Sequence, residues 1–202
     1  MKKINFTVVA ILTLTSAFLA SGCGGTTPAT PAPDTAAADL AKQGKVLYQG
    51  QDFTIAIPDK WEVISKEEFT TNYPKEIIVA FRNNVKNEIF TANMTVAIQS
   101  LDVEIPAEDF GKNSVKKQSE FVPSFKELRS STQDLTFGQT KIPTYFIQSE
   151  GKKSTQEPLL KFAQLFVVNN KKAYTVTAAY LPTEDENVVN AINEMINSFS
   201  LK

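Results

Sequence analysis

Histidine is absent from this chain of 202 residues, and cysteine occurs once, as Cys23. Histidine is the usual general base near neutral pH, and histidine and cysteine are the usual zinc ligands. Catalysis by a serine–histidine or cysteine–histidine pair is therefore excluded, and we expect no catalytic residues of that kind. Lysine plus arginine number 21 and aspartate plus glutamate 22, so the basic surface of a nucleic-acid-binding protein is also missing.

Clustered glycines are missing from the part of the chain after residue 45, where four glycines stand isolated. A phosphate-binding loop needs adjacent glycines so that backbone N–H groups can approach the ligand. Arg82 and Arg129 are the only arginines, which leaves little capacity for bidentate phosphate recognition. We expect no cofactor, no metal ligand set and no nucleic-acid partner.

The first 22 residues have the pattern of a secretory signal peptide. Lys2 and Lys3 precede a run without charged residues from Phe6 to Ala20, which is shorter than the about 20 apolar residues of a membrane-spanning helix. The run leads into Leu-Ala-Ser-Gly-Cys, ending at Cys23, which resembles a bacterial lipobox. The resemblance implies cleavage before Cys23 and two or three lipid chains on that residue, enough for stable anchoring. The alternative is an unmodified thiol behind an ordinary signal peptide.

Residues 23–45 are expected to form a flexible tether behind the lipid. The segment holds three prolines, many small residues and almost no bulky apolar side chain, so it buries too little surface to offset the entropy lost on ordering. A short helix over residues 36–42 is compatible with its alanines. The globular domain is then expected to span residues 46–202.

Strand and helix patterns alternate in residues 46–202. Apolar alternation or continuous apolar runs between turn residues predict strands, at 51–57, 61–64, 77–81, 94–98, 125–137, 142–148, 159–168 and 174–181. The last four are joined by short connections, which predicts antiparallel neighbours. Residues 159–168 and 174–181 carry large or neutral side chains on both faces, as central strands do, and Trp61 is expected in the core.

Two helices complete the predicted elements. Residues 106–121 begin with proline and two carboxylates, and their main apolar residues are Phe110, Val115 and Phe121. The last helix is predicted to be capped by Thr183 with Glu186 in a capping box. It should cover the sheet with one apolar stripe, formed by Val188, Ile192, Met195, Ile196 and Phe199. Strands and two helices in this order predict an α+β layered fold.

The segments Phe53–Trp61 (FTIAIPDKW), Ala173–Ala178 (AYTVTA) and Ile196–Leu201 (INSFSL) resemble those of the Mog1/PsbP-like family. That family has a proline-containing turn before a tryptophan and ends in a long hairpin and a helix. The resemblance implies an antiparallel β-sheet flanked by helices in an α/β/α sandwich. It also suggests similarity to PsbP-like or DcrB-like envelope lipoproteins, with binding or assembly roles rather than catalysis.

Several weaker candidates for chemistry remain. Serine–lysine catalysis would use residues such as Ser130 and Ser131, although no Ser-x-x-Lys motif is present. Two groups of carboxylates could hold calcium: Asp102, Glu104, Glu108 and Asp109, and Glu184, Asp185 and Glu186. Both groups lie near the start of a predicted helix, where negative charge is favourable without any metal ion.

Basic and aromatic side chains offer two candidate surfaces. A basic patch for anionic lipid or wall polymer would form if turn lysines project from one end of the sheet, namely Lys116, Lys117, Lys152, Lys153, Lys171 and Lys172. Aromatic residues near element ends fit either a partner-binding rim or, as we prefer, core residues under loops. They are Tyr73, Phe121, Phe125 and Tyr145.

These observations predict a non-enzymatic lipoprotein, anchored through Cys23 on the extracytoplasmic face of a cell membrane. Its domain would bind another envelope protein or assist the assembly of a macromolecular complex. Three alternatives stay open. They are an extracytoplasmic small-ligand or metal-ion binding protein, an enzyme using carboxylate or serine–lysine chemistry, and a structural spacer.

Overall fold

The computed structural model describes residues 35–69 and 73–202. The predicted signal peptide, Cys23 and the first part of the tether lie outside the described residues. The elements are α1 (Thr35–Lys42), β1 (Lys45–Gln49), β2 (Phe53–Pro58), β3 (Trp61–Ser65), the 3-10 helix η1 (Lys66–Glu68), β4 (Ile77–Asn83), β5 (Asn93–Ser100), α2 (Ala107–Phe121), β6 (Lys126–Phe137), β7 (Thr140–Lys152), β8 (Leu159–Asn169), β9 (Lys172–Tyr180), α3 (Glu186–Asn197) and β10 (Ser200–Leu201). Among these helices, none has the length and apolar character needed to cross a bilayer.

Two antiparallel sheets form the β structure. The larger has seven strands in the order β3-β4-β5-β9-β8-β7-β6, and the smaller has three in the order β1-β2-β10. The predicted α+β class and its antiparallel pairing are confirmed. The helix that the alanines allowed over residues 36–42 is present as α1, within the segment predicted to be a tether. The sequence pattern did not separate the strand at Phe53–Pro58 from the main sheet, and it did not predict β1, which pairs with that strand.

The central strands of the larger sheet are β8 and β9. Both are buried on both faces along almost their whole length, as their two-sided apolar pattern predicted. On one face, Leu165 and Val176 join a large core that includes Trp61, so the predicted core position of this tryptophan is confirmed. On the other face, Phe166 and Val168 belong to a second cluster.

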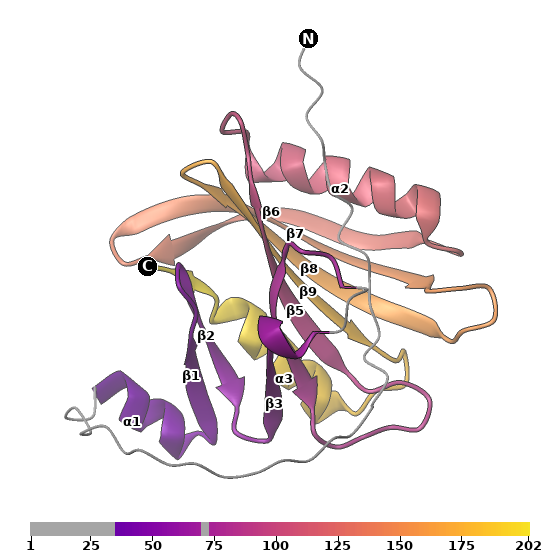
Figure 1. Ribbon diagram of the computed structural model, residues 1–202, viewed down its shortest axis with the longest axis horizontal. Coiled ribbons are helices and arrows are strands. Elements are labelled where there is room, and N and C mark those ends of the chain that lie inside the picture. Colours follow the sequence, from indigo (N-terminus) through magenta and orange to yellow (C-terminus); the bar gives the residue numbers. More distant parts are fainter. Residues whose placement is uncertain (1–34, 70–72) are drawn as a thin grey trace.

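Separate layers cover the two faces (Figure 1). The helix α2 packs on β7 and β8 over the second cluster, whereas α3 contacts β2 and β9 and closes the large core together with the small sheet. In α2, Phe110 and Val115 are buried as predicted. The prediction for Phe121 was wrong, because this side chain at the last residue of the helix is 71% exposed.

The start of α3 differs from its prediction. Its N-cap is Asp185, whose carboxylate accepts a hydrogen bond of 2.8 Å from the Asn187 N–H. Thr183 lies earlier, in a turn closed by a hydrogen bond from the Glu184 N–H to the Leu181 carbonyl, so it cannot cap the helix. Phe199 lies beyond the helix end, yet it is buried and stacks on Phe53 at a centroid distance of 5.4 Å.

Ser198 joins α3 to the small sheet. Its hydroxyl accepts a hydrogen bond of 2.9 Å from the Ala56 N–H and donates one of 2.8 Å to the Met195 carbonyl. The short strand β10 pairs with β2 only at Thr54 and Phe53. The serine therefore takes the place of a strand partner at Ala56.

Replacing Ser198 with alanine (Ser198→Ala) should lower the free energy of unfolding by about 1–3 kcal/mol, because a partly buried N–H loses its acceptor. Chemical denaturation measures this change. The matched control is Ser119→Ala, since Ser119 is exposed on α2 and bonds only to its own helix; it should change stability by about 0.5 kcal/mol or less. Equal effects of the two substitutions would contradict the bridging role of Ser198.

Candidate functional site

The strand β6 forms one edge of the seven-stranded sheet. It has 12 residues, which at about 3.3 Å per residue makes an edge about 40 Å long. Typical strands have about 5–6 residues. Within the described parts of the chain, only β7 pairs with it. An unpaired edge of this kind presents a row of backbone N–H and C=O groups to another chain.

Side chains of β6 are exposed on both faces of the sheet. The run from Lys126 to Asp134 is exposed without interruption, and burial begins only toward Phe137. The helix α2 packs on β7 and β8 rather than on β6, and the Thr132 hydroxyl of β6 has only a minor influence on the carboxylate of Glu108 on α2. The ammonium of Lys112, which lies 2.6 Å from the same carboxylate, is the main reason that the pKa of Glu108 is below its ordinary value.

A bulge and several polar contacts arrange the side chains of this edge. The pairing register with β7 shifts between Glu127 and Arg129, and Leu128, at the bulge, is 42% exposed. The guanidinium of Arg129 lies 5.8 Å from the ring centroid of Phe146, a cation–π distance. From Ser130 to Asp134 the strand has no bulge and no proline, so neither of these features interrupts the edge over these described residues.

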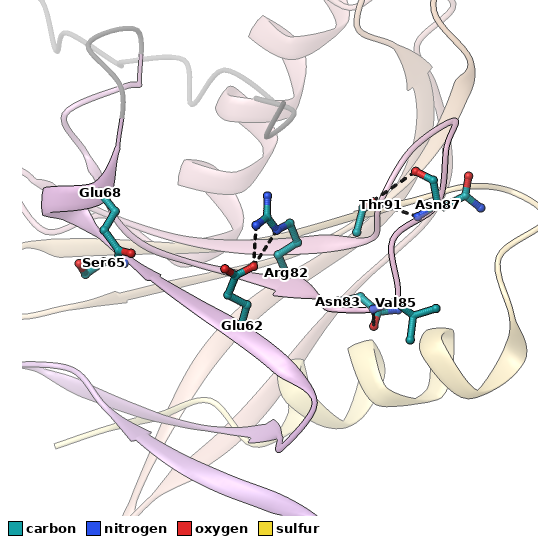
Figure 2. A network of polar contacts seen from close by, with 8 residues as sticks. All are labelled: Glu62, Ser65, Glu68, Arg82, Asn83, Val85, Asn87 and Thr91. Carbon is teal, nitrogen blue, oxygen red and sulfur yellow. Dashed lines mark hydrogen bonds and ion pairs between the residues drawn. The ribbon is translucent and has the colours of Figure 1, made fainter. Parts of the chain in front are cut away.

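The opposite edge of the sheet is much shorter. It is β3, with five residues, and its outward-facing side chains include Glu62. Arg82 on the neighbouring strand donates two hydrogen bonds to one Glu62 oxygen, at 2.6 and 3.0 Å (Figure 2). At the last residue of β3, the Ser65 N–H and hydroxyl both donate to Glu68, and these bonds lower the pKa of that carboxyl. A short edge offers few backbone groups for pairing, so the 12-residue β6 is the better candidate for binding.

The predicted serine candidates lie on this same strand. Ser130 and Ser131 are both exposed on β6, and the Ser130 hydroxyl donates to Glu127 at 2.7 Å. Its partner is thus a carboxylate and not the lysine that serine–lysine catalysis requires. What these residues supply is a small polar stretch of backbone along the edge.

The two carboxylate clusters make structural contacts. Glu104 accepts a hydrogen bond from the Lys171 N–H, Glu108 pairs with Lys112, and Asp185 caps α3. Glu184 Oε2 is buried and has no hydrogen-bond partner among the described residues. In residues 35–69 and 73–202, no three acidic or cysteine side chains form a group that could hold a metal ion.

The predicted basic patch at one end of the sheet was wrong. Lys152 pairs with Leu159 at the start of β8, whereas Lys172 pairs with Asn169 at the end of that strand. Antiparallel turns alternate between the two ends of a sheet, so these lysines lie at opposite ends. Lys172 is further engaged by Asp52 at 2.6 Å, and this hydrogen bond raises the pKa of the lysine.

The four aromatic candidates divide between the two interpretations. Tyr145 is buried beside Phe166 in the second cluster, and Phe125 and Tyr73 are half-buried. The core interpretation therefore holds for Tyr145, while Phe121 projects into solvent. These side chains do not form one continuous aromatic rim.

A polar layer under α2 was not predicted. Gln118 on α2, Ser149 on β7 and Gln164 on β8 are almost fully buried, and each has an oxygen without a partner among the described residues. Gln164 also donates to Thr177 at 3.2 Å. No motif signals this layer, because single polar residues in strand-like runs look the same in exposed and buried positions.

The open edge of β6 was also missed in the sequence. Residues 125–137 were predicted as a strand, but a strand pattern does not say which neighbour it has or where the sheet ends. The one available signal was the long polar run from Lys126 to Asp134. Apolar and polar residues do not alternate in this run, as they would in a strand with one covered face, so the run indicates a strand that is exposed on both faces.

Comparisons with known proteins support the fold. No protein-family model matches this chain, and no curated protein matches it in sequence. Its structure is similar to cyanobacterial PsbP (CyanoP) from Synechocystis, with a TM-score of 0.58, 13% identity, and 90% of this chain and 98% of that one covered. It is similar to LpqN, involved in cell envelope biogenesis of Mycobacterium tuberculosis, with a TM-score of 0.57, 13% identity, and coverage of 82% and 96%.

A third similar structure is the Ran-binding protein Mog1p of Saccharomyces cerevisiae. The TM-score is 0.51 at 12% identity, over 78% of this chain and 94% of that one. The chain therefore has the Mog1/PsbP-like fold that its sequence resemblance implied. Identities this low establish the fold and leave the function to other arguments.

Backbone hydrogen exchange should alternate along β6. Successive N–H groups of an edge strand face the neighbour and the solvent in turn, so between Ser130 and Asp134 every second amide should exchange quickly. Residue-resolved exchange by NMR tests this expectation in the dilute protein. Uniform protection along the strand would contradict an open edge.

Proposed function

We propose that this protein is a non-enzymatic lipoprotein of the cell envelope that binds another envelope protein along the edge of β6. In this mode an extended segment of the partner adds a strand to the sheet, main-chain hydrogen bonds supply affinity, and neighbouring side chains supply specificity. The observation that carries the proposal is the long, uncovered edge from Lys126 to Asp134.

The side chains of this edge favour pairing with a specific partner over self-aggregation. Its exposed side chains are mostly polar and include both signs of charge, at Lys126, Glu127, Arg129 and Asp134. Apolar edges pair indiscriminately, whereas polar and charged ones oppose wrong partners and accept those with complementary side chains. Leu128 adds one exposed apolar contact at the bulge.

The location in the envelope rests on the lipobox-like sequence before Cys23. Among the structural neighbours, LpqN is involved in cell envelope biogenesis, which is consistent with such a role. Shared folds host different functions, so this neighbour supports the proposal only in general terms.

Anchoring is tested by Cys23→Ala in the full chain. The native protein should fractionate with membranes, because two or three acyl chains bind a bilayer stably, and the variant should move to the soluble fraction. Mass spectrometry of the mature N-terminus should find lipid on Cys23. An unmodified Cys23, or a membrane fraction that does not change in the variant, would contradict the lipoprotein assignment.

Strand addition is tested by photo-cross-linking in intact cells. A photoreactive amino acid at Gln133, on β6, should capture one specific envelope protein, whereas the same group at Thr155, exposed between β7 and β8, should not. Mass spectrometry of the adduct identifies the partner and the cross-linked segment, which should be extended.

Two proline variants provide the matched control. Successive N–H groups face opposite edges of the strand, so of Ser130→Pro and Ser131→Pro one removes a hydrogen bond to β7 and the other removes an outward donor. The outward variant should keep nearly the parent stability and lose the adduct. The inward variant should lose about 0.5–1.5 kcal/mol or more of stability. An adduct that persists in the stable variant would refute binding through the β6 edge.

A further inference from the structure

The loop between β4 and β5 exposes two large apolar side chains. Val85 and Ile89 are each 69% exposed. Between them and β5, Phe90 is buried in a small cluster with Leu160 and Phe162. The loop therefore has an apolar attachment to the domain and, separately, an apolar pair turned toward solvent, which we call the 85/89 tip.

Hydrogen bonds hold the 85/89 tip in this conformation, and Figure 2 shows Asn83, Val85, Asn87 and Thr91 of this loop. Asn83 accepts from the Val85 N–H at 3.1 Å, and Asn87 accepts from the Ile89 N–H at 2.8 Å. Thr91 accepts from the Asn87 N–H at 3.2 Å. Asparagine side chains that bond to the backbone two residues later set tight turns. The apolar pair is thus presented by a built turn and does not fold back onto the core.

Strand register places the 85/89 tip at the end of the domain where the described chain begins. Asn83 pairs with Trp61, which follows the turn after β2. That turn is joined to the segment after α1 by the pairing of Lys45 with Pro58 and by a hydrogen bond of 2.8 Å from the Asp59 N–H to the Gly44 carbonyl. Figure 1 shows α1, this turn and the β4–β5 loop along the same lower edge of the view.

The chain before α1 is short enough to bring a bilayer to this end. Thr35, the first residue of α1, follows Cys23 by 12 residues. If this segment is the tether that the sequence predicts, a coil of that length would reach about 20 Å. Lipid on Cys23 would therefore hold the membrane close to α1, on the side of the molecule that carries the 85/89 tip.

The size of the 85/89 tip favours a lipid surface over a protein. A stable protein interface needs about 800 Å² from each partner, far more than two side chains on a loop can offer. Apolar residues that dip into the boundary between headgroups and acyl chains need no matching pocket, and they add to an existing lipid anchor.

We propose that Val85 and Ile89 insert into the surface of the bilayer that holds the lipid on Cys23, so that the domain lies on the membrane by its β4–β5 loop. This inference rests on the lipid anchor of the proposed function. It orients the molecule, because β4 and β6 lie toward opposite edges of the sheet. Figure 1 shows β6 on the opposite side of the view from that loop, so the β6 edge would remain accessible to a partner.

Fluorescence of single labels tests the insertion in the full chain, purified from membranes and reconstituted in phosphatidylcholine vesicles with a minor share of phosphatidylglycerol. Lipid occupies the sulfur of Cys23, so Val85→Cys and Ile89→Cys each introduce one reactive thiol for an environment-sensitive dye. Val103→Cys is the matched control, since Val103 is 54% exposed beyond the far end of β5.

Labels at 85 and 89 should shift their emission to the blue on reconstitution and be quenched by lipids with nitroxide groups near the headgroup. The label at 103 should do neither. In a second arm the dye is attached at Asn84→Cys, so that neither Val85 nor Ile89 carries the label. The double substitution Val85→Ser and Ile89→Ser changes only exposed side chains. In that variant the label at 84 should lose most of the quenching that it shows in the parent.

The outcomes separate this inference from the proposed function. Labels at 85 and 89 that behave like the label at 103, in protein that still sediments with the vesicles, overturn insertion and leave the anchor intact. Protein that does not associate with membranes overturns both. A blue shift that appears only after envelope proteins are added assigns the 85/89 tip to a protein partner and overturns the lipid proposal.

Discussion

Burial of β8 and β9 on both faces is the constraint on which the rest of this structure depends. Strands with apolar side chains on both sides are stable only between two covering layers. The helix α2 supplies one layer, and α3 with the small sheet supplies the other. Phe199 illustrates how closely the second layer fits, since its ring lies within 5.4–6.4 Å of the ring centroids of Phe53, Tyr174 and Phe137.

Both proposed surfaces arise because the sheet is larger than its cover. The layer formed by α2 lies over β7 and β8, so most of β6 extends past it. At the other side of the sheet, the β4–β5 loop projects beyond the strand ends and carries the 85/89 tip. A polar strand edge tolerates water until a partner displaces it, while an exposed apolar pair favours a nonaqueous environment. The two surfaces therefore suit different occupants, a protein at the β6 edge and a bilayer at the β4–β5 loop.

Polar side chains position these surfaces. Arg82 of β4 binds Glu62 on the short edge, Asn83 and Asn87 shape the loop, and Arg129 covers an aromatic face beside the long edge. Hydrogen bonds of this type contribute modestly to stability, about 0.5–1.5 kcal/mol each. Their larger effect is geometric, because they decide which backbone and side-chain groups remain accessible.

The sequence by itself determined the local elements: the strands from residue 125 to 181, the helix over 107–121, the core position of Trp61 and the Mog1/PsbP-like resemblance. Periodicity and turn residues act between near neighbours, so these features can be read without knowing the fold. Only the tertiary structure decided that β1, β2 and β10 form a second sheet, that Asp185 rather than Thr183 caps α3, and that Phe121 faces solvent. It also decided that β6 is an edge and that Lys152 and Lys172 lie apart, because strand order and cover depend on contacts between residues distant in the chain.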